Sequence, residues 1–182
     1  MDHTAKHQNP QKHIRSLFEI VDSVATALVC VVLLFTLVFR IFVVSGGSML
    51  TTLYDGDRLV VSNLFYEPKR GDIIVFASEY KNEEVLVKRV IATEGQTVDI
   101  SKEGEVTVDG VVIEEPYLQE GMVTEIGTVS LPYVVEEDQL FVMGDNRIDS
   151  LDSRSELLGP VEMNKVLGRV LFRLFPHTGK VQ

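Results

Sequence analysis

A long apolar run near the N-terminus constrains this chain more than any other feature. No charged residue occurs from Val24 to Phe39, and after Arg40 the run continues to Val44. A helix that crosses the hydrocarbon core of a membrane needs about 20 predominantly apolar residues. The run meets that length if the Arg40 side chain extends to the interface. We therefore expect one transmembrane helix and assign it to residues 17–44.

Basic residues before the run predict its orientation. Lys6, Lys12 and Arg15 precede it, and the positive-inside rule keeps such an end in the cytoplasm. Residues 1–16 are then a cytoplasmic tail, and the chain after the anchor lies outside. Two alternatives fit less well. A cleaved signal peptide would have an apolar region of only about 7–15 residues, and a buried core helix would show a polar face.

Charge and composition exclude several classes of function. The net charge is −10, and the residues from Ser45 onward hold 13 Lys and Arg against 24 Asp and Glu. Nucleic-acid binding needs clustered basic residues, so we expect no nucleic-acid partner. The only cysteine, Cys30, lies in the apolar run, which leaves no thiolate cluster for a metal. Three of the four histidines precede residue 14 and the fourth is His177, so no histidine-based mechanism or metal site is expected in the body.

After Asp57 the pattern changes to short β-branched runs separated by turn residues. Runs spaced about ten residues apart predict an all-β sandwich or partly open barrel of antiparallel sheet. The expected strands are 58–62, 72–76, 85–93, 97–100, 105–108, 111–113, 127–134, 139–143 and 166–174. Asp109-Gly110 lies between two of these runs and is a strong signal for a tight hairpin. The acidic stretch 94–138 shows no obvious chemistry, so we interpret it as a β subdomain inserted into a core of residues 45–93 and 139–182.

A glycine-rich segment directly after the anchor contains a candidate nucleophile. Gly46 and Gly47 precede Ser48, and glycines let a backbone approach a substrate and present N–H groups to an oxyanion. Ser48 lies four residues past Val44, so at most about 14 Å of extended chain separates it from the anchor. Such a hydroxyl reaches only what sits at the membrane surface, which suits a membrane-inserted substrate. The alternative is a flexible hinge between anchor and body.

A second segment, Val85–Ala92, places a lysine among apolar residues. Strand alternation puts Leu86, Lys88 and Val90 on one face. Desolvation lowers the pKa of a buried lysine, so its amine can become neutral near pH 7 and take a proton from a serine hydroxyl. The alternative is an edge-strand lysine that discourages aggregation.

A third segment, Gly144–Arg154, holds three Asp, one Asn, two Ser and two Arg within eleven residues. This density of opposite charges and hydroxyls suits a hydrogen-bonded scaffold that holds a lysine in place. A solvated loop with Asx turns is the alternative, and the arginines argue against a carboxylate metal site. A fourth segment, Gly71–Phe76, is interpreted as a turn that leads into a buried strand.

Taken in order after an N-terminal anchor, these segments resemble the bacterial type I signal peptidase (leader peptidase) family of serine peptidases with a Ser–Lys dyad. The family motifs S-M-x-P-T-L, G-D-x-x-x-F, K-R-V and G-D-N-R-x-x-S-x-D-S-R correspond to Ser48–Leu53, Gly71–Phe76, Lys88–Val90 and Gly144–Arg154. The last motif matches at every fixed position, and the resemblance covers about residues 20–176. It implies an anchored endopeptidase that removes N-terminal signal peptides from secretory preproteins at the extracytoplasmic face of a bacterial cell membrane.

The resemblance also implies roles for particular residues. Ser48 is implied to be the nucleophile and Lys88 the general base, and the backbone of Gly46, Gly47 and Ser48 is implied to bind the oxyanion. The residues implied to support the lysine by hydrogen bonds and ion pairs are Ser150, Asp152, Arg154, Asp145 and Arg147. Those implied to line shallow pockets for small substrate side chains are Met49, Leu53 and Val87. No cofactor or metal is implied, and the expected partners are secretory preproteins and membrane lipid.

The sequence departs from the family pattern in two places. Thr51 stands where the family has proline after the nucleophile, which makes that turn less rigid. Where the family has G-x-P-G-D after K-R-V, this chain has Ala92, Glu94, Gly95 and Gln96. These changes affect the expected pocket shape and substrate preference. They also leave open a catalytically silent relative that acts as an assembly or chaperone module for surface-protein export, although such a relative would be expected to lose one member of the dyad.

Overall fold

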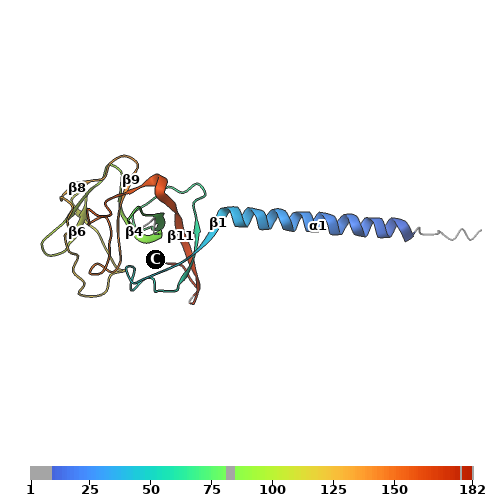
Figure 1. Cartoon of the computed structure of the whole chain (residues 1–182), viewed down its shortest axis with the longest axis horizontal. Coiled ribbons are helices and arrows are strands. Elements are labelled where there is room, and N and C mark those ends of the chain that lie inside the picture. Colours follow the sequence, from blue (N-terminus) through green and yellow to red (C-terminus); the bar gives the residue numbers. More distant parts are fainter. Residues whose placement is uncertain (1–9, 81–84, 177, 182) are drawn as a thin grey trace, which may run out of the picture. The chain divides into compact units, whose positions relative to one another are not determined.

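The computed structural model describes residues 10–80, 85–176 and 178–181 (Figure 1). The chain divides into two compact units, Met1–Val38 and Phe39–Gln182. The first unit contains helix α1, Pro10–Val38. Its segment Phe18–Thr36 has 19 residues and a mean hydropathy of 2.2, so it is long and apolar enough to cross a membrane. Residues 1–9 of the predicted cytoplasmic tail lie outside the described residues.

The apolar run does not stay helical to Val44 as the sequence predicted. Helix α1 ends at Val38, and Phe39–Val43 forms strand β1, which pairs with strand β2, Arg58–Ser62. The β-branched and aromatic residues of this stretch favour a strand, and pairing with β2 satisfies its backbone N–H and C=O groups. Arg40 therefore lies in a sheet strand, two residues after the end of the helix, and not within the helix.

One seven-stranded antiparallel sheet forms the centre of the second unit, which confirms the predicted mainly β fold. Its strand order is β1-β2-β11-β3-β4-β9-β10. A short 3-10 helix leads from β10 into β11 and spans Met163–Lys165. The remaining strands are β3 (Ile73–Ala77), β4 (Val85–Thr93), β9 (Gln139–Met143), β10 (Val161–Glu162) and β11 (Val166–Phe175). Because β4 lies between β3 and β9, most of its side chains are buried.

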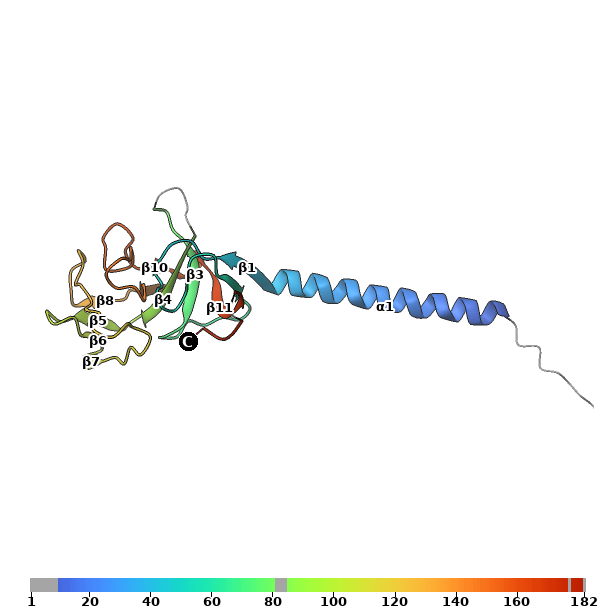
Figure 2. The ribbon, with the colours of Figure 1, turned by 90° about the horizontal axis from the view of Figure 1, so that it is seen from below.

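A second, four-stranded sheet lies in the stretch 94–138 that the sequence marked as an insertion. Its strands, in the order β7-β6-β5-β8, are β5 (Thr97–Ile100), β6 (Val106–Val108), β7 (Val111–Val112) and β8 (Tyr133–Val134). Asp109 and Gly110 join β6 to β7 with φ angles of 54° and 76°, as expected of a tight hairpin. Figure 2 shows this small sheet at the end of the second unit farthest from β1. That it is a folding unit of its own stays a prediction.

Apolar side chains cover both faces of the seven-stranded sheet. On one face, Ile73 and Val75 of β3 pack in a cluster with Met49 and Leu53 from the segment after β1. On the other face, Ile74 packs with side chains of β9 and β11. The alternation of side chains along β3 explains this division. In a third cluster, β4 and β9 pack against β5 and β6. The first cluster thus fixes the segment after β1 on the sheet that contains β4.

Candidate active site

The segment after β1 forms a tight loop that carries Ser48. The Gly46 N–H donates to Asp55 Oδ1 at 2.9 Å, which ties the two ends of the loop together. Within the loop, the Leu53 N–H donates to Met49 O at 2.9 Å. Both of these side chains are buried in the core. Ser48 therefore sits on a turn whose next residue is held in place by packing.

Strand β4 brings Lys88 to this turn. Lys88 is only 2% exposed, and its Nζ donates a hydrogen bond to Ser48 Oγ at 2.6 Å. The structure thus brings together the serine and the lysine that the sequence singled out, which lie 40 positions apart. The alternative interpretation of Lys88 as an exposed edge-strand residue is wrong, because β4 is an interior strand of the sheet.

Arg89, the residue after Lys88, links its strand to the same turn. Arg89 Nε and Nη2 donate to the two carboxylate oxygens of Asp145 at 2.8 and 2.7 Å. Asp145 also accepts a hydrogen bond from Thr52 Oγ1, four residues after Ser48. The side chains of Arg89 and Asp145 are only 3% and 0% exposed. A two-pronged ion pair fixes geometry better than a single contact does. Asp145 therefore connects the strand of Lys88 to the turn of Ser48.

Asn146 holds the backbone at Gly47 and Ser48 in place by two hydrogen bonds. Its N–H donates to Ser48 O at 3.0 Å, and its Nδ2 donates to Gly47 O at 3.0 Å. Gly144 allows this close approach, because a Cβ at that position would lie 2.4 Å from Ser48 O and 2.2 Å from Ser150 Oγ. Asn146 was not among the predicted site residues, although its place in the Gly144–Arg154 motif offered a signal.

Asp152 and Arg154 form a buried ion pair inside the loop 144–154. Arg154 Nε and Nη2 donate to Asp152 Oδ1 and Oδ2, each at 2.8 Å, and the Gly144 N–H donates to Asp152 Oδ2 at 2.9 Å. Burial opposes the charged form of Asp152, but the hydrogen bond and charge of Arg154 outweigh it and lower the pKa of Asp152. Arg154 Nη1 also donates to Arg147 O at 2.9 Å. This pair therefore holds the two ends of the loop together.

Arg147 is held by the inserted segment. Its guanidinium forms a bidentate ion pair with Glu115 and donates to Thr124 Oγ1 at 2.6 Å. Glu115 also accepts a hydrogen bond from the Tyr117 hydroxyl at 2.8 Å. Burial, followed by the charge of Glu115, raises the pKa of Tyr117. The Tyr117 ring centroid lies 3.8 Å from Arg89 Cζ. Sequence reasoning missed Glu115 and Tyr117, because single residues in an acidic stretch form no recognisable pattern.

Two contacts that the resemblance implied are not found. Ser150 Oγ is buried against Gly144 and has no partner at hydrogen-bond geometry among the described residues, so the implied bond to Lys88 is not seen. Its hydroxyl still lies near enough to Asp152 to help lower the pKa of that carboxyl. The Gly46 N–H already donates to Asp55 and is not available to an oxyanion. The N–H groups of Gly47 and Ser48 make no hydrogen bond within the described part of the chain. These two backbone donors therefore remain available to bind an oxyanion at Ser48.

The residues implied to line substrate pockets belong to one apolar cluster. Met49 and Leu53 are buried in it, whereas Val87 is only partly buried and packs against it. Val87 is therefore the member of this set with surface left for contact with a substrate.

Two departures from the family pattern lie at the base of the small sheet. The Asp138 N–H donates to Glu94 Oε2 at 3.0 Å, and the Thr93 N–H donates to Gln96 Oε1 at 3.0 Å. Gln96 Nε2 also donates to Asp109 Oδ2 at 3.1 Å. Glu94 therefore links the two ends of the inserted segment, and Gln96 links its start to the β6–β7 hairpin.

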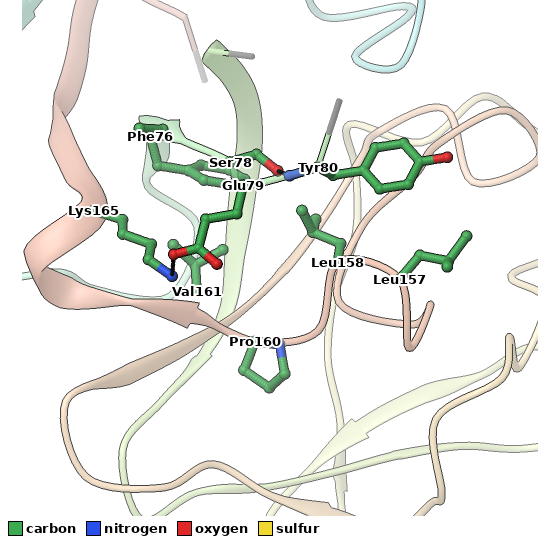
Figure 3. A pocket seen from close by; sticks show the side chains of 10 residues that line it. Phe76, Ser78, Glu79, Tyr80, Leu157, Leu158, Pro160, Val161 and Lys165 are labelled. Carbon is green, nitrogen blue, oxygen red and sulfur yellow. Dashed lines mark hydrogen bonds and ion pairs between the residues drawn. The ribbon is translucent and has the colours of Figure 1, made fainter. Parts of the chain in front are cut away.

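A separate pocket of about 120 Å³ lies at the end of β3 (Figure 3). Phe76, Leu158 and Val161 supply apolar side chains to it, and the ion pair of Glu79 with Lys165 lies at its side, with 3.0 Å between Oε1 and Nζ. Neither Ser48 nor Lys88 lines this pocket. It is therefore distinct from the site that contains the serine and the lysine.

One unit contains an apolar helix. The other is a β-sheet body that buries a lysine amine against a serine hydroxyl. Together these features define a class of anchored, mainly β proteins. Comparison with known proteins identifies the family. The chain matches the model of the signal peptidase family, peptidase S26, over residues 17–175 and belongs to that family.

Relatives from several bacteria resemble the chain over most of its length. The signal peptidase I of Bacillus licheniformis is 37% identical over 174 residues, which cover 88% of this chain and 90% of the relative. The probable signal peptidase I-1 of a Synechocystis species is 38% identical over 164 residues, with coverages of 82% and 80%. A crystal structure of a signal peptidase I from Enterococcus faecalis V583 aligns with a TM-score of 0.49 and 30% identity, over 58% of this chain and 97% of that one. Family membership makes this chain a membrane-anchored, serine-type peptidase whose substrates are preproteins with signal peptides.

Proposed function

We propose that this chain removes N-terminal signal peptides from secretory precursors by acyl-enzyme chemistry, with Ser48 as the nucleophile and Lys88 as the general base. One observation carries the proposal: Lys88 Nζ lies 2.6 Å from Ser48 Oγ and is almost fully buried. Burial disfavours the charged ammonium, so a neutral amine is available to accept a proton. A hydroxyl within hydrogen-bond distance of a base is the arrangement that nucleophilic catalysis requires.

The reaction then proceeds in two halves. Neutral Lys88 accepts the Ser48 proton while Oγ attacks the carbonyl carbon of the scissile bond. The N–H groups of Ser48 and Gly47 stabilise the oxyanion, and removal of one such donor can cost about 10²–10³ in rate. Lys88 then gives its proton to the leaving amine, and the signal peptide remains as an ester on Ser48. Water, losing a proton to Lys88, hydrolyses the ester and restores the hydroxyl.

The charged residues around the dyad act by positioning it. Asp145 ties Arg89 of β4 to the serine turn, and Arg147, Asp152 and Arg154 hold the loop that faces the turn. Ser150 has a buried hydroxyl with no partner at hydrogen-bond geometry among the described residues. We assign it the role of bonding to the lysine amine once that amine leaves Ser48.

The anchor places this chemistry at a membrane. In our assignment, residues 1–16 are a cytoplasmic tail, the apolar part of α1 crosses the bilayer, and the β unit is extracytoplasmic. The apolar segment of a precursor lies in the same bilayer. Its cleavage region adds as an extended strand to the part of β4 before Arg89, which pairs with β3 but not with β9. Small side chains before the cut contact Val87, behind which Met49 and Leu53 form the wall of the pocket.

Cleavage assays on the detergent-solubilised full chain test the proposal. The substrate is a synthetic precursor peptide with an Ala-x-Ala cleavage site. Ser48→Ala and Lys88→Met should each lose about 10³-fold or more in activity. The controls Ser130→Ala and Lys102→Met change exposed residues and should cleave like the wild type. Full activity in either dyad variant contradicts the assignment, and a wild-type protein that leaves the peptide intact favours the silent assembly module.

A further inference from the structure

The inserted segment supplies two side chains to the buried charges beside the dyad. Tyr117 contacts Arg89, and Glu115 contacts Arg147. The hydroxyl of the tyrosine donates to the carboxylate, so the two side chains also hold each other. Neither residue belongs to a motif that the proposed reaction uses.

We propose that Tyr117 is a positioning residue for the Ser48–Lys88 pair, that it acts through Arg89, and that Glu115 holds its ring in place. The inference rests on the proposed function, because it requires that pair to be the catalytic one. It assigns the inserted segment a part in catalysis.

The contact between Tyr117 and Arg89 is unusually close for this protein. A guanidinium within about 6 Å of an aromatic centroid is attracted by the ring face. Arg58 over Phe175 and Arg169 over Tyr66 lie close to that limit, at 5.9 and 5.7 Å. The corresponding distance at Tyr117 is 3.8 Å, so its ring lies directly against the Arg89 guanidinium.

The Tyr117 ring also shields the ion pair of Arg89 with Asp145 from water. Arg89 and Asp145 are 3% and 0% exposed, and the Tyr117 ring is part of the cover over the arginine. Charges attract each other more strongly when water is kept away. Because Asp145 also accepts the hydrogen bond from Thr52, a firmly held Arg89 keeps the turn of Ser48 in place.

A second route leads from the same two residues to the same turn. Glu115 holds Arg147, whose Nε donates to Gly144 O at 3.1 Å. Gly144 packs closely against Ser48 O, since a Cβ at Gly144 would lie 2.4 Å from that oxygen. Both routes end at the turn that carries the serine, so loss of the Tyr117 ring should weaken catalysis more than it weakens substrate binding.

Steady-state cleavage of the precursor peptide by the detergent-solubilised full chain separates these effects. Tyr117→Leu should lower kcat about tenfold with KM unchanged, in line with the value of a desolvated cation–π contact. Tyr117→Phe keeps the ring face and should stay within about threefold of the wild type. The matched control is Tyr133→Leu, which removes a ring of the same segment that packs on Phe141 at 5.7 Å. Its kcat should not change.

A series of fluorinated phenylalanines at position 117 keeps the test independent of folding. Added fluorine withdraws charge from the ring face with little change in shape, so log kcat should fall stepwise with each fluorine. A flat series, or equal kcat values for Tyr117→Leu and Tyr133→Leu, overturns the inference. Ser48→Ala separates the two proposals. If it is inactive while the series is flat, only this inference fails, whereas an active Ser48→Ala variant removes the proposed function itself.

Discussion

The loop 144–154 and the inserted segment 94–138 both place carboxylates against buried arginines, but they reach the dyad by different paths. Asp145 of the loop binds Arg89 and also Thr52, which belongs to the serine turn. Glu115 of the insertion binds Arg147, whose side chain bonds to Gly144 O and not to the turn itself. The importance of a buried carboxylate in this protein therefore depends on how many elements it joins.

Replacement of Asp145 should therefore have the largest effect. Asp145→Ala removes the carboxylate that faces Arg89 and releases Thr52, and loss of one member of a buried ion pair costs about 3–5 kcal/mol. Glu115→Ala should cost only about 1–3 kcal/mol, because Glu115 is 11% exposed and Arg147 keeps its bond to Thr124. Denaturation of the full chain in detergent, followed by circular dichroism, measures both losses. Equal losses would contradict the comparison.

Gly144→Ala should have the next largest effect, on catalysis. The new Cβ would lie 2.4 Å from Ser48 O, so the turn must move. Displacement of a reacting group by about 1 Å can cost about 10²-fold in rate, and we expect a loss of kcat of that size. Gly179→Ala is the control, because a Cβ there meets open space. An unchanged kcat in Gly144→Ala would mean that the close approach does not position the serine.

Much of the fold could be predicted from the sequence, because alternation and turn residues mark most strands. The predicted strands 58–62, 85–93 and 139–143 coincide with β2, β4 and β9. Strand β1 was missed, because an apolar stretch beside a membrane helix looks like more helix until its pairing with β2 is known. The predicted strand 127–134 shrinks to β8, since Gly127 has a φ of 81° and Pro132 has no N–H to donate.

The site, like the fold, could be predicted only in part from the sequence. Ser48, Lys88 and the loop 144–154 could be found because each lies in a local motif. Tyr117 could not, because its contact with Arg89 depends on how the inserted segment folds back onto β4. No local spacing encodes such a contact. The missing bond of Ser150 to the lysine shows a further limit, since a motif names a residue but does not give its resting hydrogen bonds.

Asp152→Asn should have a smaller effect that depends on pH. The pKa of Asp152 is lowered in the folded state, mainly because Arg154 overcomes the opposing effect of burial. Its stabilisation is therefore present above the unfolded pKa of about 3.9 and is lost as the pH falls through the folded value. Asparagine mimics the protonated acid, so the variant should be less stable by about 2 kcal/mol at pH 7. The gap should shrink as the pH falls below about 4 and should close below the folded pKa of Asp152. Denaturation across that range measures it, and a gap that does not vary with pH would exclude the charge of Asp152 as its cause.

Glu79→Gln should have the smallest effect, and it sets the baseline against which the buried pairs are judged. Glu79 Oε1 and Lys165 Nζ are 3.0 Å apart, as close as a strong ion pair, but the two side chains are 82% and 30% exposed. The hydrogen bond to Glu79 raises the pKa of Lys165, so any stabilisation is present below the unfolded pKa of about 10.4 and is lost as the pH rises through the folded value. Water and salt screen such a pair, so we expect a loss below about 0.5 kcal/mol and a Tm shift below about 2 °C. A loss as large as that of Asp152→Asn would show that exposure does not separate the weak ion pairs of this protein from the strong ones.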